Sequence, residues 1–343
     1  MTAFCNFNSS ELSSWLKSEN EREFHSKQLF SWVYEKGVLD WERMTNLSKN
    51  LRQKLSEKLK LPLLKLVRVQ PSSDLETYKF LWRLPDNNLV ESVLILSGER
   101  RTVCVSSQVG CPARCAFCAS GQKGFMRNLS AAEIVEQVLL INQWLKDRDE
   151  RVSHVVYMGM GEPLKNYNAV VKSVHLLSDP ETFNISQRRI TISTVGIVEG
   201  IKRLTHEDMK VNLVLSLHAP NQRIRMKIIP YARKYPLEDI LAAMQEYSEV
   251  TKRDVTYEYI LIEGINDHPD HAHELALMLR GRQCTVNLIP YNAVLGLKLN
   301  RPDKGAVKAF RAVLFGCRIP NTCRYTKGDD IAAACGQLAM QHE

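Results

Sequence analysis

Three cysteines crowd into eight residues of this sequence, at Cys111, Cys115 and Cys118. The spacing Cys-x3-Cys-x2-Cys brings three thiolates together on one loop, directly after a β-rich run. A [4Fe–4S] cluster usually takes four cysteine ligands, so three leave one iron open to a small molecule. Structural zinc is the alternative, but it needs a fourth ligand, for which His154 and His175 are the candidates. We therefore expect an iron–sulfur cluster with one open position.

A glycine-rich stretch, Met-Gly-Met-Gly-Glu-Pro-Leu, contains Gly161 and Glu162 and follows the apolar run His154–Met158. Glycines let a ligand approach the backbone, and a carboxylate accepts hydrogen bonds from an ammonium group. A plain turn is the alternative interpretation. Residues at the ends of later predicted strands are further candidates for ligand contacts, or else turn residues: Ser193, Ser216, Leu217, His218 and Asn292.

The sequence between and beyond these motifs alternates between strand and helix patterns. From residue 101 on, six β-rich runs each precede a helical pattern, from Thr102–Ser106 to Thr285–Ile289. One of these helices is expected over Ser130–Leu145 and opens with the capping box Ser130-x-x-Glu133. Such alternation is typical of a parallel sheet with helices outside it. Six units fall short of the eight in a closed barrel, so we expect an α/β fold with a partial, open-sided (β/α)6 barrel.

The two ends of the chain depart from this alternation. Helical patterns followed by short β-like runs predict a small α+β accessory domain over residues 1–98. The barrel is expected over residues 99–300, and a C-terminal extension over residues 301–343. Within this extension, the segment Asp329–Gln341 has a helical pattern.

Composition indicates a soluble, cytoplasmic protein with an acidic partner. The 343 residues carry a net charge of +8, and no apolar run approaches the ~18 residues of a membrane span. Nine cysteines in so long a chain suit a reducing compartment, where thiols serve metals, catalysis or packing. One basic run without an acid is expected to contact RNA phosphates, with a solvated loop as the alternative: Arg223, Arg225, Lys227, Arg233 and Lys234.

The cysteine motif resembles the signature of the radical S-adenosylmethionine (SAM) superfamily, in which an aromatic residue precedes the last cysteine, as Phe117 does here. Four ordered segments between about Glu91 and Leu338 are similar to the RlmN/Cfr family of RNA adenine methyltransferases. They are Cys-Val-Ser-Ser-Gln-Val-Gly-Cys, Gly-Met-Gly-Glu-Pro-Leu, Asn-Leu-Ile-Pro-Tyr-Asn and Gly-Asp-Asp-Ile-x-Ala-Ala-Cys-Gly-Gln-Leu. The resemblance implies a radical SAM barrel, one [4Fe–4S] cluster on the three cysteines, and SAM bound by the glycine-rich stretch and the strand-end residues.

The resemblance also implies roles for three residues that spacing alone does not link. Cys335 would carry the methyl group, Cys104 would resolve the intermediate, and Glu91 would accept a proton. Adenine C2 is an electron-poor carbon and not a nucleophile, so the family's route is two-stage and uses two SAM molecules per turnover. A thiolate takes the methyl group from the first SAM, and a radical from the second activates it. A transient Cys104–Cys335 disulfide then frees the methylated base.

For this chain, the resemblance implies methylation of adenine C2 in 23S rRNA and in the tRNA anticodon loop. It also implies an electron donor such as flavodoxin, and we expect a monomer. The target base must leave its stack to react, which favours unpaired RNA. Alternatives are C8 methylation of 23S rRNA by the antibiotic-resistance branch, a radical SAM enzyme acting on peptides or in sulfur insertion, and a non-catalytic iron–sulfur RNA-binding protein.

Overall fold

A ten-stranded sheet forms the centre of the computed structural model, which describes residues 1–324 and 327–338. The strand order is β14-β13-β12-β11-β10-β9-β6-β5-β4-β3. Seven adjacent strands are parallel, namely β6 (Arg100–Cys104), β9 (His154–Tyr157), β10 (Ile190–Thr194), β11 (Asn212–Ser216), β12 (Val255–Leu261), β13 (Cys284–Pro290) and β14 (Asn321–Cys323). The two strands at the edges of this sheet are not hydrogen-bonded to each other, so the barrel is open.

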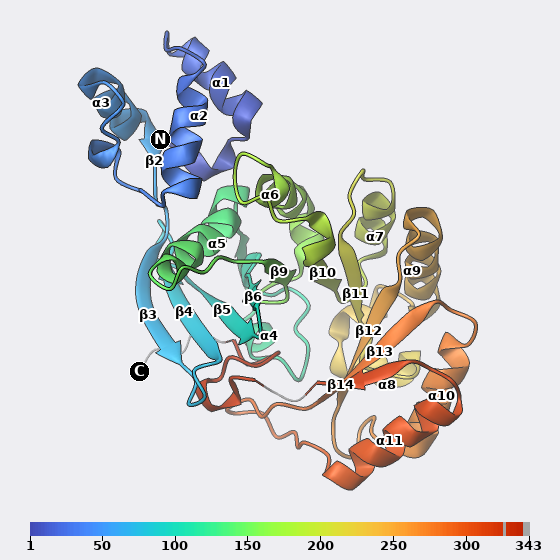
Figure 1. The fold of residues 1–343 in the computed structure, drawn as a ribbon. Helices are drawn as coiled ribbons and strands as arrows, with labels where there is room; N and C mark the ends of the chain where they lie inside the picture. Colours follow the sequence, from blue (N-terminus) through green and yellow to red (C-terminus); the bar gives the residue numbers. More distant parts are fainter. Residues whose placement is uncertain (325–326, 339–343) are drawn as a thin grey trace.

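Helices alternate with the parallel strands and lie along the outside of the curved sheet (Figure 1). They are α5 (Ala131–Lys146), α6 (Tyr167–Ser178), α7 (Val198–Thr205), α9 (Leu237–Thr251), α10 (Pro269–Leu279) and α11 (Lys304–Gly316). This arrangement confirms the predicted partial (β/α)6 barrel. The short β14 is a seventh parallel strand that the sequence pattern did not predict.

The predicted capping box fixes the start of α5. Ser130 Oγ accepts a hydrogen bond from the backbone N–H of Glu133 at 3.2 Å, and Glu133 Oε2 accepts one from the N–H of Ser130 at 2.8 Å. These two bonds satisfy N–H groups that lack partners inside the helix. Eleven residues of α5 are buried, and its buried apolar side chains pack in the main hydrophobic core.

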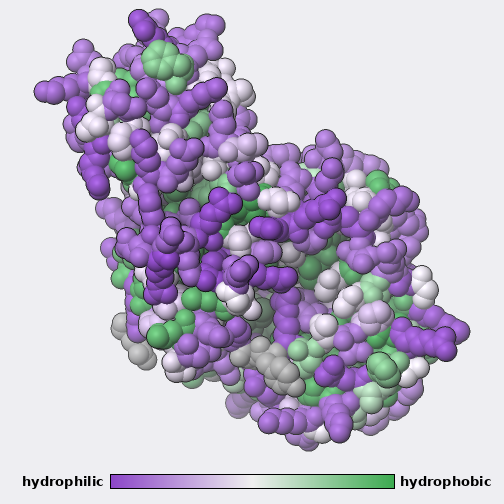
Figure 2. All heavy atoms as spheres, viewed as in Figure 1, coloured by the Kyte–Doolittle hydropathy of each residue, from purple (hydrophilic) through white to green (hydrophobic). Residues whose placement is uncertain are grey.

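The N-terminal part consists of a helical lobe and an extension of the central sheet. The lobe contains α1 (Ser9–Ser18), α2 (His25–Phe30) and α3 (Lys49–Lys58), with β1 (Thr2–Ala3) paired to β2 (Leu59–Lys60). It lies at the top left of Figures 1 and 2, where hydrophilic side chains cover most of the visible face. The extension is antiparallel and comprises β3 (Lys65–Pro71), β4 (Thr77–Arg83) and β5 (Leu89–Ser97). Because β5 also pairs with β6, these strands continue the barrel sheet, and a domain boundary near residue 98 stays a prediction.

The C-terminal segment corrects one prediction. The helix expected over Asp329–Gln341 is wrong for the described residues, which form a single 3-10 turn at Asp329–Ile331 and then irregular turns to Leu338. Ala332 and Gly336 have φ values of 51° and 86°, which a right-handed helix excludes. Positions 339–341 lie outside the described residues. In the described part of the chain, no helix is both long and apolar enough to cross a membrane.

Candidate active site

The three motif cysteines lie on the loop that follows β6, at the carboxyl end of the parallel strands. A hairpin of β7 (Gln108–Gly110) and β8 (Phe125–Asn128) holds the two ends of this loop together. Cys111 N donates to Gly124 O at 2.9 Å. A Cβ at Gly110 would lie 1.8 Å from that same oxygen, and φ there is +72°, so a side chain is excluded where the hairpin closes.

The surroundings of the cysteines fit an iron–sulfur cluster. Burial raises the pKa of Cys111 to about 12 and also raises the pKa of Cys115 and of Cys118. The neighbouring thiols raise the pKa of Cys115 further, while backbone N–H groups directed at Cys111 and Cys118 oppose the shift in those two residues. A cluster would supply the positive charge that three buried thiolates need, and N–H···S bonds of this kind tune such clusters.

Among the described residues, no three His, Cys, Asp or Glu side chains converge on a single metal ion. This geometry is compatible with a four-iron cluster, because each thiolate there binds a different iron atom. A cluster held by these three sulfurs alone would keep one iron open to a small molecule.

A small cavity of about 120 Å³ adjoins the cysteines, and we call it the cluster-side cavity. It lies at the carboxyl ends of β9 to β12, where α/β proteins bind ligands. Most of the predicted SAM contacts line it together with the three cysteines: Gly161, Glu162, Ser193, Ser216 and His218. The two serine hydroxyls, from adjacent strands, are 3.3 Å apart.

Glu162 is buried and is suited to bind a cation. Its carboxylate accepts N–H bonds from Leu164 at 2.9 Å and from Val195 at 2.7 Å. Burial nevertheless raises the pKa of Glu162 to about 7, because those bonds only partly offset the lost hydration. An ammonium group in the cavity would favour the ionised form. Gly161 has a φ of +107°, and a Cβ there would lie 2.7 Å from Gln108 Cβ, so only glycine fits where this turn packs against the Ser107–Gln108 segment.

His218 and Leu217 lie side by side after β11 but differ in what they offer the cavity. Burial and nearby Arg225 lower the pKa of His218 to about 3, and its Nδ1 accepts the N–H of Ile260 at 3.0 Å, so the imidazole is neutral. Its ring meets Phe117 edge to face at 4.9 Å between centroids. The Leu217 side chain packs in the main hydrophobic core instead, and Leu217 does not line the cluster-side cavity.

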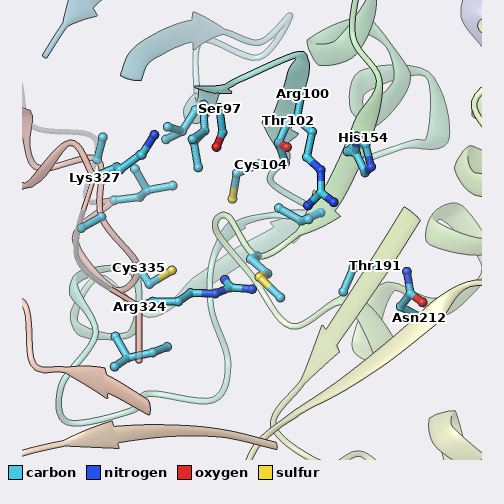
Figure 3. A pocket seen from close by; sticks show the side chains of 18 of the residues that line it. Ser97, Arg100, Thr102, Cys104, His154, Thr191, Asn212, Arg324, Lys327 and Cys335 are labelled. Atoms are coloured by element: carbon cyan, nitrogen blue, oxygen red, sulfur yellow. The ribbon is translucent and has the colours of Figure 1, made fainter. Parts of the chain in front are cut away.

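A larger cavity of about 620 Å³ runs inside the barrel, and we call it the barrel cavity. Cys104, at the end of β6, and Cys335, in the C-terminal segment, both line it and point into it (Figure 3). Cys335 also lines the cluster-side cavity and so connects the two. The predicted contact Asn292 lines the barrel cavity, and its Nδ2 donates to the backbone oxygen of Cys335 at 3.2 Å.

Both thiols are protonated at rest. Loss of hydration inside the cavity raises the pKa of Cys335 to about 11, the carboxylate of Glu258 adds to the shift, and Arg324 opposes it. Burial, together with the neighbouring Cys335, also raises the pKa of Cys104. The two residues interact electrostatically, yet each is a free cysteine in this structure.

Glu91 lies on β5, close to the C-terminal segment. Its carboxylate is buried, 3.6 Å from Lys79 Nζ, and Lys79 in turn donates to the backbone oxygen of Ala332 at 3.5 Å. Glu91 lines neither of the two cavities. The structure therefore brings Glu91 near the segment that carries Cys335 without placing it on a cavity wall.

Two charged residues at the site differ from what the sequence analysis expected. Arg225 was expected to contact phosphates, and this is wrong, because its side chain is fully buried and donates to the backbone oxygens of Leu217, Val195 and Ser216. Glu258, in β12, was missed, although it lines the cluster-side cavity. A single acid inside the otherwise apolar run Val255–Leu261 was the signal for an inward-facing functional position.

The fold and the cysteine loop define a radical SAM enzyme, a class that implies a [4Fe–4S] cluster and SAM. Residues 105–276 match the Radical SAM superfamily, and residues 2–61 match the family described as ribosomal RNA large subunit methyltransferase N-terminal domain. A radical SAM methyltransferase from Sphaerobacter thermophilus has a similar structure, with a TM-score of 0.97 and 41% identity over 98% of this chain and 99% of that one.

Curated relatives match this chain over more than nine tenths of their own length. A probable dual-specificity RNA methyltransferase RlmN 2 of Protochlamydia amoebophila is 69% identical over 98% of this chain and 94% of its own length. A probable dual-specificity RNA methyltransferase RlmN of Fervidobacterium nodosum is 48% identical over 93% of this chain and 92% of its own. The chain belongs to the RlmN family of radical SAM RNA methyltransferases.

Proposed function

We propose that this enzyme methylates C2 of an adenine in 23S rRNA and in the tRNA anticodon loop, through an S-methylcysteine and a transient disulfide. One observation carries the proposal: Cys104 and Cys335 point into the same cavity, and Cys335 also reaches the cavity beside the cysteine loop. The names of its relatives support two RNA substrates, since they are dual-specificity RNA methyltransferases.

Cys335 is placed to carry the methyl group. Its thiolate would displace the methyl group of one SAM, and the high pKa makes that thiolate a strong nucleophile once it forms. A cluster held by Cys111, Cys115 and Cys118, with a second SAM in the cluster-side cavity, would supply a 5′-deoxyadenosyl radical that removes one hydrogen atom from the S-methyl group. Asn292, which holds the backbone oxygen of Cys335, orients the methyl carrier between the two cavities.

Glu91 and Cys104 would complete the reaction. The radical methylene carbon on Cys335 would bond to C2, so the C2 hydrogen must leave as a proton, for which Glu91 is the proposed acceptor. One electron must also leave, and the oxidised cluster, when held by Cys111, Cys115 and Cys118, would take it back. Cys104 thiolate would then attack the Cys335 sulfur, forming an S–S bond and breaking the bond from sulfur to carbon. The electron pair of the broken bond goes to the released carbon, which takes up a proton and becomes the methyl group of the product. External reduction of that disulfide restores both thiols. We also propose two SAM molecules per turnover, a one-electron donor such as flavodoxin, a monomer and a cytoplasmic location.

The nucleoside product tests this function. RNA from cells with and without the protein is digested, and its nucleosides are separated by mass spectrometry against 2-methyladenosine and 8-methyladenosine standards. We expect 2-methyladenosine in both 23S rRNA and tRNA to depend on the protein. If 8-methyladenosine depends on it instead, the C8 alternative holds and the proposed position is wrong. If only rRNA changes, the second substrate is wrong.

A further inference from the structure

The barrel cavity extends to the amino-terminal ends of the parallel strands. The residues that line it there start β6, β9 and β11 or precede β10, and we call them the amino-end rim: Arg100, His154, Arg188, Arg189 and Asn212. The sheet pairs Thr102 with His154 and Thr191 with Asn212, and Arg100 and Arg189 each lie two residues before one of these paired positions. Figure 3 shows Arg100, His154 and Asn212 at the side of the cavity away from Cys335.

The amino-end rim is strongly cationic. Arg100, Arg188 and Arg189 are exposed, and within the described part of the chain their guanidinium groups pair with no carboxylate. No Asp or Glu of that part lines the barrel cavity. Arg100 and Arg189 both lie close enough to His154 to act with burial in lowering its pKa, so the cations are grouped around one end of the cavity. Unpaired arginines grouped in this way attract a polyanion.

The cavity connects this rim to the two thiols. Alternate residues with inward-facing side chains line its wall: Thr102 and Cys104 on β6, His154 and Val156 on β9, and Met158 directly after β9. At about 620 Å³, the cavity has the size of a pocket for a nucleotide-sized ligand. The cluster-side cavity, with about 120 Å³, lies at the opposite strand ends, where the cysteine loop and the C-terminal segment cover it.

We propose that the RNA approaches the barrel from the amino-terminal ends of the strands, with Arg100, Arg188 and Arg189 holding phosphates beside the target adenosine. The unstacked base then passes along the barrel cavity to Cys104 and Cys335, while SAM occupies the carboxyl-terminal side. This proposal rests on the proposed function, since it takes RNA as the substrate. The arginines act as positioning residues through the phosphates and touch no reacting atom.

The test replaces both rim arginines before β10, as Arg188→Gln/Arg189→Gln, in the cluster-containing enzyme. We expect the Kd for a tRNA to rise on the order of tenfold at physiological salt, and the slope of log Kd against log salt to fall by about one per lost phosphate contact. The KM for RNA rises with the Kd. Methylation of Cys335 by SAM without RNA, followed by peptide mass spectrometry, stays at the wild-type level, which shows that the variant is folded.

Two further variants make the result decisive. Arg280→Gln/Arg318→Gln removes two exposed arginines that precede β13 and β14 at the same strand ends but do not line the barrel cavity, and it should raise the Kd less than the rim pair does. Arg223→Gln/Lys227→Gln tests the approach over α8 (Gln222–Ile228) that the basic run in the sequence predicts. If that pair weakens RNA binding while the rim pair does not, the proposed entry side is wrong. If wild-type enzyme methylates no RNA at all, the proposed function fails, whereas unchanged binding by the rim pair overturns this inference alone.

Discussion

Cys104 is the residue whose replacement separates methyl transfer from product release. It faces Cys335 across the barrel cavity, and it is not one of the three cysteines of the cysteine loop. Of the two thiols, only Cys335 takes part in the first steps of the proposed route, so these steps do not need the Cys104 thiol. Only the cleavage that frees the methylated base does.

We therefore expect Cys104→Ala to trap the enzyme on its RNA. Without the resolving thiol, the adenine stays tethered to Cys335 through the methylene carbon, so a single-turnover reaction should give a covalent protein–RNA band on a denaturing gel. Cys284→Ala, which removes a buried free cysteine outside both cavities, is the matched control and should release methylated RNA normally. Free methylated RNA from the Cys104 variant at the wild-type rate would exclude the resolving role.

At this scale, the sequence predicted residues whose chemistry is local and missed those whose role depends on distant contacts. The three cysteines and Gly161 with Glu162 occur in short motifs, so their neighbourhood was visible in the chain. Arg225 sits in a basic run, but its partners are backbone oxygens from other loops, and no local pattern reveals that burial.

Among the elements, α5 shows a local signal that fully determines a boundary. The Ser130 hydroxyl and the Glu133 carboxylate cap its first turn. Glu133 Oε1 also accepts a hydrogen bond from Arg127 Nη2 at 2.8 Å. The C-terminal segment shows the opposite case. Its alanine-rich sequence has helical propensity, but Ala119 N donates to Gly336 O and Ser120 Oγ donates to Leu338 O, both at 2.7 Å. Those bonds to the cysteine loop need an irregular chain, so tertiary contacts override the local preference.

Ser130→Ala should destabilise the enzyme by about 1 kcal/mol, the usual cost of losing an N-cap side chain. The loss is measured as a lower midpoint in urea unfolding, with the slope unchanged. Ser18→Ala is the matched control, because that exposed serine donates only to the backbone oxygen of Trp15 within its own turn of α1. Equal midpoints for the two variants would show that the cap contributes nothing to stability.

On the scale of the whole molecule, Glu136 ties the helical lobe to the barrel. This buried residue of α5 accepts the backbone N–H groups of Leu63 at 2.5 Å and Leu64 at 3.0 Å, in the stretch that joins the lobe to β3. Burial raises the pKa of Glu136 to about 7. The sequence placed Glu136 on a helix but gave no sign of this contact, since its partners are more than 70 residues away.

Stability should therefore fall as pH rises through this range. Below the unfolded pKa of about 4.5, Glu136 is protonated in both the folded and the unfolded state. Between about 4.5 and about 7, the carboxyl ionises in the unfolded chain but stays protonated in the folded protein, so the free energy of unfolding falls as pH rises. Above pH 7, Glu136 is ionised in both states and the decrease levels off. Glu136→Gln keeps an oxygen for both N–H groups and should flatten this part of the Tm-against-pH curve. Glu57→Gln, an exposed control, should leave it unchanged. Identical curves for all three proteins would contradict the assignment.

The position of Cys335 also constrains when a newly made chain can start work. Its acceptor thiol, and the oxygens of Gly336 and Leu338 that anchor the cysteine loop, come from residues that leave the ribosome after the whole parallel sheet. On the proposed route, a nascent polypeptide that lacks them has nothing to receive a methyl group, although the residues of the parallel sheet are already made. We therefore expect a chain that ends before Cys335 to transfer no methyl group to RNA.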